Sequence, residues 1–137
     1  ISRQLLKSDK TVSIRLQMEE DIYIRADRTH LSNMISNLSD NAEKYSDEKA
    51  DICIKCQIQG KACQISVIDK GIGIPLDKQP FLFNKFYRVP TGNRHDVKGY
   101  GLGLYYVKMM AELHGGSIRV ESSPGKGSTF TLEIPMK

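Results

Sequence analysis

The order of two hydrophobic spacings limits the fold of this chain more than any other feature. Apolar residues that alternate with polar ones predict strands, and apolar residues three or four apart predict helices. Along the 137 residues these spacings give the order strand, strand, helix, strand, strand, irregular segment, helix, strand, strand. Consecutive strands in this order need antiparallel partners. The order therefore favours an α+β sandwich with helices on one face over a doubly wound parallel sheet.

Six segments alternate with period two. They are Thr11–Gln17, Ile22–Ala26, Ile52–Ile58, Ala62–Asp69, Ser117–Ser122 and Ser128–Ile134. The third and fourth predict a hairpin around Gln59-Gly60, and the last two predict another around residues 124–127. Asp69 has the same parity as Cys63, Ile65 and Val67, so it lies on their face of the strand. We therefore expect a carboxylate at the strand end, on the apolar face that the helices cover.

Two segments have helical spacing. The first runs from Arg28 to Tyr45, with Asp27 as its predicted N-cap. The second runs over residues 102–114 and ends at Gly115-Gly116. Between them, residues 71–100 have no regular pattern beyond one short helix expected near residues 76–82. An irregular segment of about 30 residues inside a compact domain is typical of a lid or a binding loop.

Charge and hydropathy exclude two classes of partner. The net charge of +4 is small, and the densest basic stretch, Lys85 to Lys98, is interrupted by Asp96. This pattern does not predict nucleic-acid binding. No apolar run approaches the roughly 20 residues that a membrane span requires. We therefore expect one domain that makes no direct membrane contact.

The cysteines and histidines form no recognisable site. Cys53 and Cys56 make a C-x-x-C, which invites a zinc or redox interpretation. Residues three apart on a strand point to opposite faces, so ordinary thiols, Cys63 included, are expected instead. The histidines His30, His95 and His114 lack a paired carboxylate or nucleophile at a telling spacing, and structural roles are expected for all three.

An amide stripe follows the first helix. Asn33, Asn37 and Asn41 are four residues apart, and Lys44 continues the stripe. An amide oxygen is a neutral, hard ligand that suits a partly hydrated Mg²⁺ already held by phosphates, and Lys44 can reach a phosphate as a point charge. The alternative is a solvated helix face. Because asparagine is a poor helix former, three on one stripe favour function.

Two glycine-rich segments add to this chemistry. The first, residues 69–75, reads Asp-Lys-Gly-Ile-Gly-Ile-Pro, and its carboxylate can accept a hydrogen bond from an exocyclic amine. The second, residues 99–104, precedes a helix whose N-terminal N–H groups favour an anion. Its G-x-G-x-G spacing differs from the Rossmann motif. The segment Gly125-Lys126-Gly127-Ser128 differs from a P-loop, since glycine follows the lysine and a strand comes next.

Together these motifs resemble four conserved boxes of bacterial sensor histidine kinases. In chain order they are Asn37-x-x-x-Asn41-Ala42-x-Lys44-Tyr45-Ser46, Asp69-x-Gly71-x-Gly73-Ile74-Pro75, Phe83-x-x-Phe86-Tyr87-Arg88 and Gly99-x-Gly101-Leu102-Gly103-Leu104. The resemblance implies the Bergerat ATP-binding fold, in which a mixed, mostly antiparallel sheet backs the helices and ATP lies under a mobile lid. It implies an ATP-binding domain over residues 11–137, a lid over about 75–101, and a linker over residues 1–10.

The resemblance also implies roles for individual residues, with ATP and Mg²⁺ as cofactors. Asn41 is the implied metal ligand, with Asn37 and Lys44 near the phosphates. Tyr45 packs on adenine, and Asp69 accepts the adenine amine. The other implied nucleotide contacts are Gly71, Gly73, Ile74, Gly99, Gly101, Leu102, Gly103, Leu104 and Thr129. The implied catalytic set is Asn37, Lys44 and three lid cations, Arg88, Arg94 and Lys98.

Two differences between this sequence and the family pattern affect the reaction that we expect. Hydrolytic relatives carry a glutamate at the position of Asn37, and an amide cannot act as a general base. The site therefore favours passing the γ-phosphoryl group to an acceptor other than water. No histidine here fits the family's H-E/D-x-x-x-P box, so the acceptor is expected on a separate dimerisation domain, with a response regulator as an indirect partner. A cytoplasmic domain of a protein in the bacterial inner membrane is expected.

Two other functions remain open. An anti-sigma-type Ser/Thr kinase would share the fold, although the segment Phe83–Arg88 argues against it. A nucleotide-sensing interaction module with a degenerate site is the second alternative. The intact Asn41, Lys44 and Asp69 argue against degeneracy.

Overall fold

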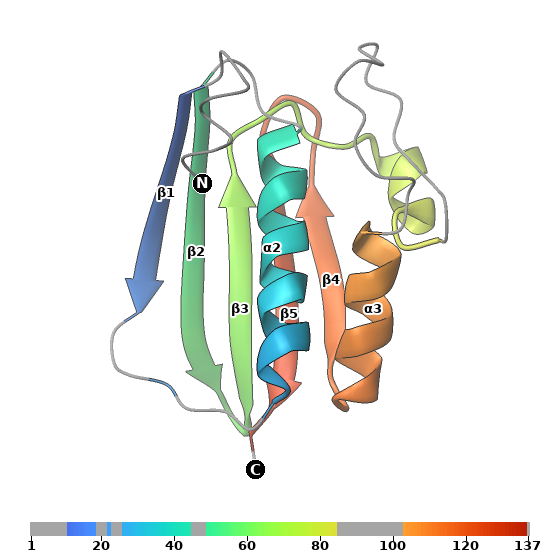
Figure 1. The fold of residues 1–137 in the computed structure, drawn as a ribbon. Coiled ribbons are helices and arrows are strands. Elements are labelled where there is room, and N and C mark those ends of the chain that lie inside the picture. Colours follow the sequence, from blue (N-terminus) through green and yellow to red (C-terminus); the bar gives the residue numbers. More distant parts are fainter. Residues whose placement is uncertain (1–10, 19–21, 23–25, 45–48, 85–102, 137) are drawn as a thin grey trace.

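The computed structural model describes residues 11–18, 22, 26–44, 49–84 and 103–136. Five strands form one sheet, and two helices cover one of its faces (Figure 1). In chain order the elements are β1 (Thr11–Met18), α2 (Arg28–Lys44), β2 (Lys49–Gln59), β3 (Ala62–Asp69), the 3₁₀ helix η1 (Leu76–Phe81), α3 (Gly103–Leu113), β4 (Ser117–Ser122) and β5 (Ser128–Pro135). The expected two-layer α+β architecture is confirmed.

The sheet has the strand order β1-β2-β3-β5-β4 and is mixed. β1 runs parallel to β2, whereas the β2–β3, β3–β5 and β4–β5 pairs are antiparallel. The chain between β1 and β2 includes α2, which provides the long crossover that a parallel pair requires. The expected strand at residues 22–26 lies mostly outside the described residues, and its two described ends, Ile22 and Ala26, are not in a strand.

The core lies between the sheet and the two helices. Its fully buried side chains follow the predicted periods of two and about 3.6. They include Met34, Leu38, Ala42, Ile52, Val67, Val107, Ala111, Phe130, Leu132 and Ile134. The ring of Phe83, in the segment after η1, meets Phe130 edge to face with 6.2 Å between centroids. This core packs α2 against β2 and β3, and α3 against β4 and β5.

Both helices have defined ends. The Asp27 carboxylate accepts the backbone N–H of His30 at 3.0 Å, and this bond is the main reason that the pKa of Asp27 is lowered. The predicted N-cap is therefore confirmed. At the end of α3 the N–H of Gly116 donates to the carbonyl oxygen of Ala111 at 2.8 Å, and Gly115 adopts a φ of +80°. This is the expected glycine cap.

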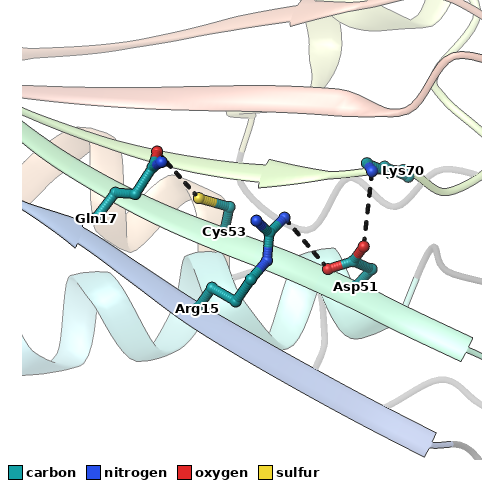
Figure 2. Close-up of polar contacts among 5 residues, drawn as sticks. All are labelled: Arg15, Gln17, Asp51, Cys53 and Lys70. Atoms are coloured by element: carbon teal, nitrogen blue, oxygen red, sulfur yellow. Dashed lines mark hydrogen bonds and ion pairs between the residues drawn. The ribbon is translucent and has the colours of Figure 1, made fainter.

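The second face of the sheet is polar. Figure 2 shows Asp51 between Arg15 and Lys70, at 3.5 and 3.7 Å, on the side of the strands away from the helices. On the same face the thiol of Cys53 donates to Gln17 at 3.7 Å. Cys56 instead packs against the core. The prediction that the two thiols of the C-x-x-C lie on opposite faces is confirmed.

A further polar row crosses four strands on this face. The Gln57 amide donates to Gln64 at 3.2 Å, the Gln64 amide donates to Glu133 at 3.1 Å, and Arg119 pairs with Glu133 at 3.5 Å. Within the described ranges, no helix is both long and apolar enough to span a membrane.

Candidate functional site

Asp69 ends β3 on the face that the helices cover. The residue is only 3% exposed, and one of its carboxylate oxygens accepts the Gly71 N–H at 2.8 Å. Its neighbours in register are Ile52 and Ser128. Burial raises the pKa of Asp69, and backbone hydrogen bonds from Gly71 and Ser128 oppose that rise. The structure thus presents a buried, oriented hydrogen-bond acceptor at the end of the central strand of the sheet.

The helix that carries the amide stripe, α2, packs against β3, the strand that ends at Asp69. Asn37, Asn41 and Lys44 are half-buried, whereas Asn33 is exposed. The Nδ2 atom of Asn41 is buried and has no hydrogen-bond partner among the described residues. Since buried polar atoms in folded proteins are nearly always paired, this amide nitrogen is a donor that the described residues leave open, and a ligand or a water molecule could accept its hydrogen bond.

The start of α3 lies beside the same stripe. A Cβ placed on Gly103 would stand 3.7 Å from Oδ1 of Asn37, which is ordinary van der Waals contact. The start of α3, where a helix dipole has its positive end, therefore adjoins the middle of α2. The Leu104 side chain packs against the core. The described end of the second glycine segment thus lies beside Asn37 of α2.

Gly73 in the first glycine segment has a structural requirement for glycine. Its φ is +77°, and a Cβ there would overlap the carbonyl oxygen of Ser123. Ile74, the next residue, is fully buried in the core. Contact with the β4–β5 hairpin therefore accounts for the glycine at position 73.

Thr129 is not brought to the site. β5 buries Phe130, Leu132 and Ile134 under the helices, so Thr129 projects toward the opposite, polar face. The strand instead places Ser128, which is 4% exposed, next to Asp69 in register. The sequence already indicated this placement. Ser128 and Phe130 are two residues apart on a strand, so they share a face.

Several expected site residues lie outside the described residues. They are Tyr45, Arg88, Arg94, Lys98, Gly99, Gly101 and Leu102. The expected lid over residues 75–101 is described only as far as residue 84. The part that is described begins with η1, which the sequence predicted as a short helix.

The donor set fits a phosphate-bound cation better than a cage of charged ligands. Across the described residues, no three histidine, cysteine, aspartate or glutamate side chains are grouped to hold a metal ion. The half-buried amide of Asn41 offers a neutral oxygen instead. Such a ligand suits Mg²⁺ that already carries phosphate oxygens and water.

A hollow of about 370 Å³ lies elsewhere, along one flank of α3. It is lined by Phe83, Asn84, Tyr105, Lys108, Met109 and Glu112. None of these residues belongs to the expected nucleotide or catalytic set. The candidate site remains the end of β3 with the parts of α2 and α3 that pack near it, because these elements carry a buried acceptor, a buried amide nitrogen without a described partner and the start of a helix.

Known proteins are similar to this chain in sequence. The family model described as histidine kinase-, DNA gyrase B-, and HSP90-like ATPase matches residues 26–137. The sensor protein RprX of Bacteroides fragilis is 44% identical over 115 residues, covering 82% of this chain and 22% of RprX. The sensor-like histidine kinase SenX3 of Mycolicibacterium smegmatis is 40% identical over 136 residues, covering 98% of this chain and 35% of SenX3.

The fold agrees with solved structures of the same kind. The catalytic domain of histidine kinase ThkA superposes with a TM-score of 0.78 at 27% identity, covering 98% of this chain and 86% of that domain. The chain spans only 22% and 35% of the two curated relatives. It matches solved catalytic domains over nearly its whole length. The chain belongs to the family of histidine kinase-, DNA gyrase B- and HSP90-like ATPases, as an ATP-binding domain of the sensor histidine kinase type.

Proposed function

We propose that this domain holds Mg²⁺-ATP and presents its γ-phosphoryl group to a histidine on a separate dimerisation domain of the same kinase. The observation that carries the proposal is the buried Asp69 carboxylate, oriented by the Gly71 N–H at the end of β3. An acceptor held in this way favours a ligand with an exocyclic amine, and adenine has one. The kinases named among the relatives support this assignment.

The phosphates would lie toward α2 and the start of α3. Lys44, the last residue of α2, would contribute positive charge, and the N–H groups at the start of α3 would donate to phosphate oxygens. Asn41 would hold Mg²⁺ through its amide oxygen. When bound, the metal neutralises charge that develops on the phosphates during transfer.

Asn37 would keep the site from hydrolysing ATP. Its amide lies beside Gly103, close to where the phosphates are proposed to bind. An amide cannot take a proton from water at neutral pH, so bound ATP is spared from hydrolysis. Catalysis would rest on positioning and on charge neutralisation.

The partners follow from the same proposal. The phosphoryl acceptor would be a histidine on the dimerisation domain, and a response regulator would then receive the phosphoryl group. The domain would work in the cytoplasm, attached to a sensor in the bacterial inner membrane. The related sensor proteins support this scheme.

Calorimetric titration tests the proposal. ADP and a non-hydrolysable ATP analogue are titrated into wild type and Asp69→Asn, with and without Mg²⁺. We expect binding to wild type that tightens with Mg²⁺ and is lost in Asp69→Asn. The dimerisation domain is then added with radiolabelled ATP, and acid-labile label on its histidine is expected. Absence of nucleotide binding to folded wild type contradicts the proposal, and label on serine or threonine favours the anti-sigma-type alternative.

A further inference from the structure

Ser122, the last residue of β4, links two segments that are distant in the sequence. Its hydroxyl oxygen accepts the N–H of Ile74 at 2.8 Å and donates to the carbonyl oxygen of Gly127 at 2.8 Å. The hydroxyl of Ser128 lies 2.8 Å away. A hydroxyl has one proton, so a Ser122 that donates to Gly127 receives the proton of Ser128. Ser122 thereby satisfies one backbone group of the segment after Asp69 and one of the β4–β5 turn.

Gln79 of η1 completes the connection. Its amide nitrogen donates to the carbonyl oxygen of Ile74 at 2.9 Å and to that of Ser122 at 3.0 Å. Both N–H groups of one side-chain amide are thus used. Ile74 is held by side chains at its N–H and at its carbonyl, outside any sheet ladder.

The backbone around this link leaves little freedom. Gly125 donates its N–H to the carbonyl oxygen of Ile72 at 2.7 Å. A Cβ on Gly73 would overlap the carbonyl of Ser123, and a Cβ on Gly127 would overlap the carbonyl of Asp69. The segment after Asp69 and the β4–β5 turn therefore form one closely packed unit.

We propose that Ser122 and Gln79 are positioning residues of the nucleotide-base site. They hold residues 71–74 in place, and this segment carries the Gly71 N–H that orients the Asp69 carboxylate. Neither side chain needs to touch the nucleotide. The inference rests on the proposed function, since it concerns how Asp69 recognises the adenine amine.

The test compares ADP with inosine diphosphate, which has a carbonyl in place of the adenine amine. Affinities are measured by calorimetry for wild type, Ser122→Ala and Gln79→Met, at a temperature where circular dichroism shows each to be folded. We expect ADP affinity to fall about tenfold, with little change for inosine diphosphate. Ser122→Thr keeps the hydroxyl and should restore most of the discrimination.

Matched controls lie on the polar face. Ser66→Ala removes a hydroxyl that is 3.2 Å from Thr131, and Gln64→Met removes an amide that donates to Glu133. Both should leave the ratio of ADP to inosine diphosphate affinity unchanged.

The outcomes separate the two proposals. If wild type binds no ADP, the proposed function fails. If wild type discriminates and the folded variants discriminate equally well, Ser122 and Gln79 are only structural and the inference fails. If a variant does not fold, amide hydrogen exchange of wild type decides. Protected Ile74 and Gly71 amides support the link, and exchange as fast as in an unstructured peptide overturns it.

Discussion

At the scale of single residues, the buried carboxylate of Asp69 lowers the stability of the fold at neutral pH. Its pKa is raised because burial disfavours the charged carboxylate. The folded state thus binds this proton more tightly than the unfolded state does. The contribution of Asp69 to stability is present below its ordinary value of 3.8 and is lost as pH rises through the folded pKa.

The substitution Asp69→Asn should restore the stability that the buried charge removes at neutral pH. The amide oxygen can still accept the Gly71 N–H, and no charge is buried. We expect the free energy of unfolding at pH 7 to rise by about 0.5–2 kcal/mol, with the gain shrinking toward pH 3, while ADP binding disappears. Urea unfolding at both pH values checks this. A variant less stable than wild type at pH 7 would contradict the expectation.

Two glycines should respond differently to alanine. Gly103→Ala places its Cβ at van der Waals distance from Asn37, so the variant should fold with stability within about 1 kcal/mol of wild type. Any loss of ADP affinity would then come from a clash between the added methyl group and the phosphates of the nucleotide. Gly73→Ala forces a positive φ and an overlap with Ser123, and should cost more than about 2 kcal/mol. Thermal unfolding of both, followed by ADP titration of Gly103→Ala, separates the two causes.

At the scale of elements, α2 and α3 are joined at the end opposite the site. The Asp27 N–H donates to Nε2 of His114 at 3.3 Å, so Nδ1 of His114 carries the proton and donates to the Met110 carbonyl at 2.8 Å. His30 and the Tyr106 hydroxyl lie 2.8 Å apart. The structural roles expected for His30 and His114 are confirmed, and His95 lies outside the described residues.

Asp27 should give the opposite pH dependence to Asp69. Its lowered pKa means that its contribution to stability is present above about 3.8 and is lost as pH falls through the folded pKa. Asp27→Asn keeps a cap of equal rank that does not titrate. We expect the difference in unfolding midpoint between wild type and Asp27→Asn to narrow from pH 7 to pH 2. An unchanged difference over that range would contradict the assignment of the cap.

At the scale of the whole molecule, the sequence predicted the features that follow from local residue spacing. It did not predict the features that depend on contacts between segments distant in the sequence. Alternation placed Asp69 on the covered face because Val67 and Ile65 share its parity. The same rule applied to Phe130 would have selected Ser128 over Thr129. The parallel pairing of β1 with β2 and the contact of Gly73 with Ser123 join residues far apart in sequence, and no local pattern specifies them.

The reaction itself gives a further prediction at this scale. Asn37→Glu places a carboxylate where the hydrolytic members of the family are expected to carry one. Because a carboxylate can accept a proton from water, Mg²⁺-dependent release of phosphate should rise at least about tenfold above wild type. A coupled phosphate assay measures it, with Asn33→Glu on the exposed end of the same stripe as control. Equal rates in both variants would mean that position 37 does not face the attacking water.

The packing of the β4–β5 turn also determines where the protein tolerates added sequence. Surface turns ordinarily accept insertions, but lengthening residues 123–127 would separate Gly125 from Ile72 and disturb the base site. A Cβ would meet open space at Gly60 and at Gly125 alike, but the turn at Gly60 lies at the other end of β3, roughly 23 Å from Asp69 at the usual rise per residue. An inserted reporter domain should therefore be silent at Gly60 and should change nucleotide affinity at Gly125, which makes one turn a site for tagging and the other a site for engineered control.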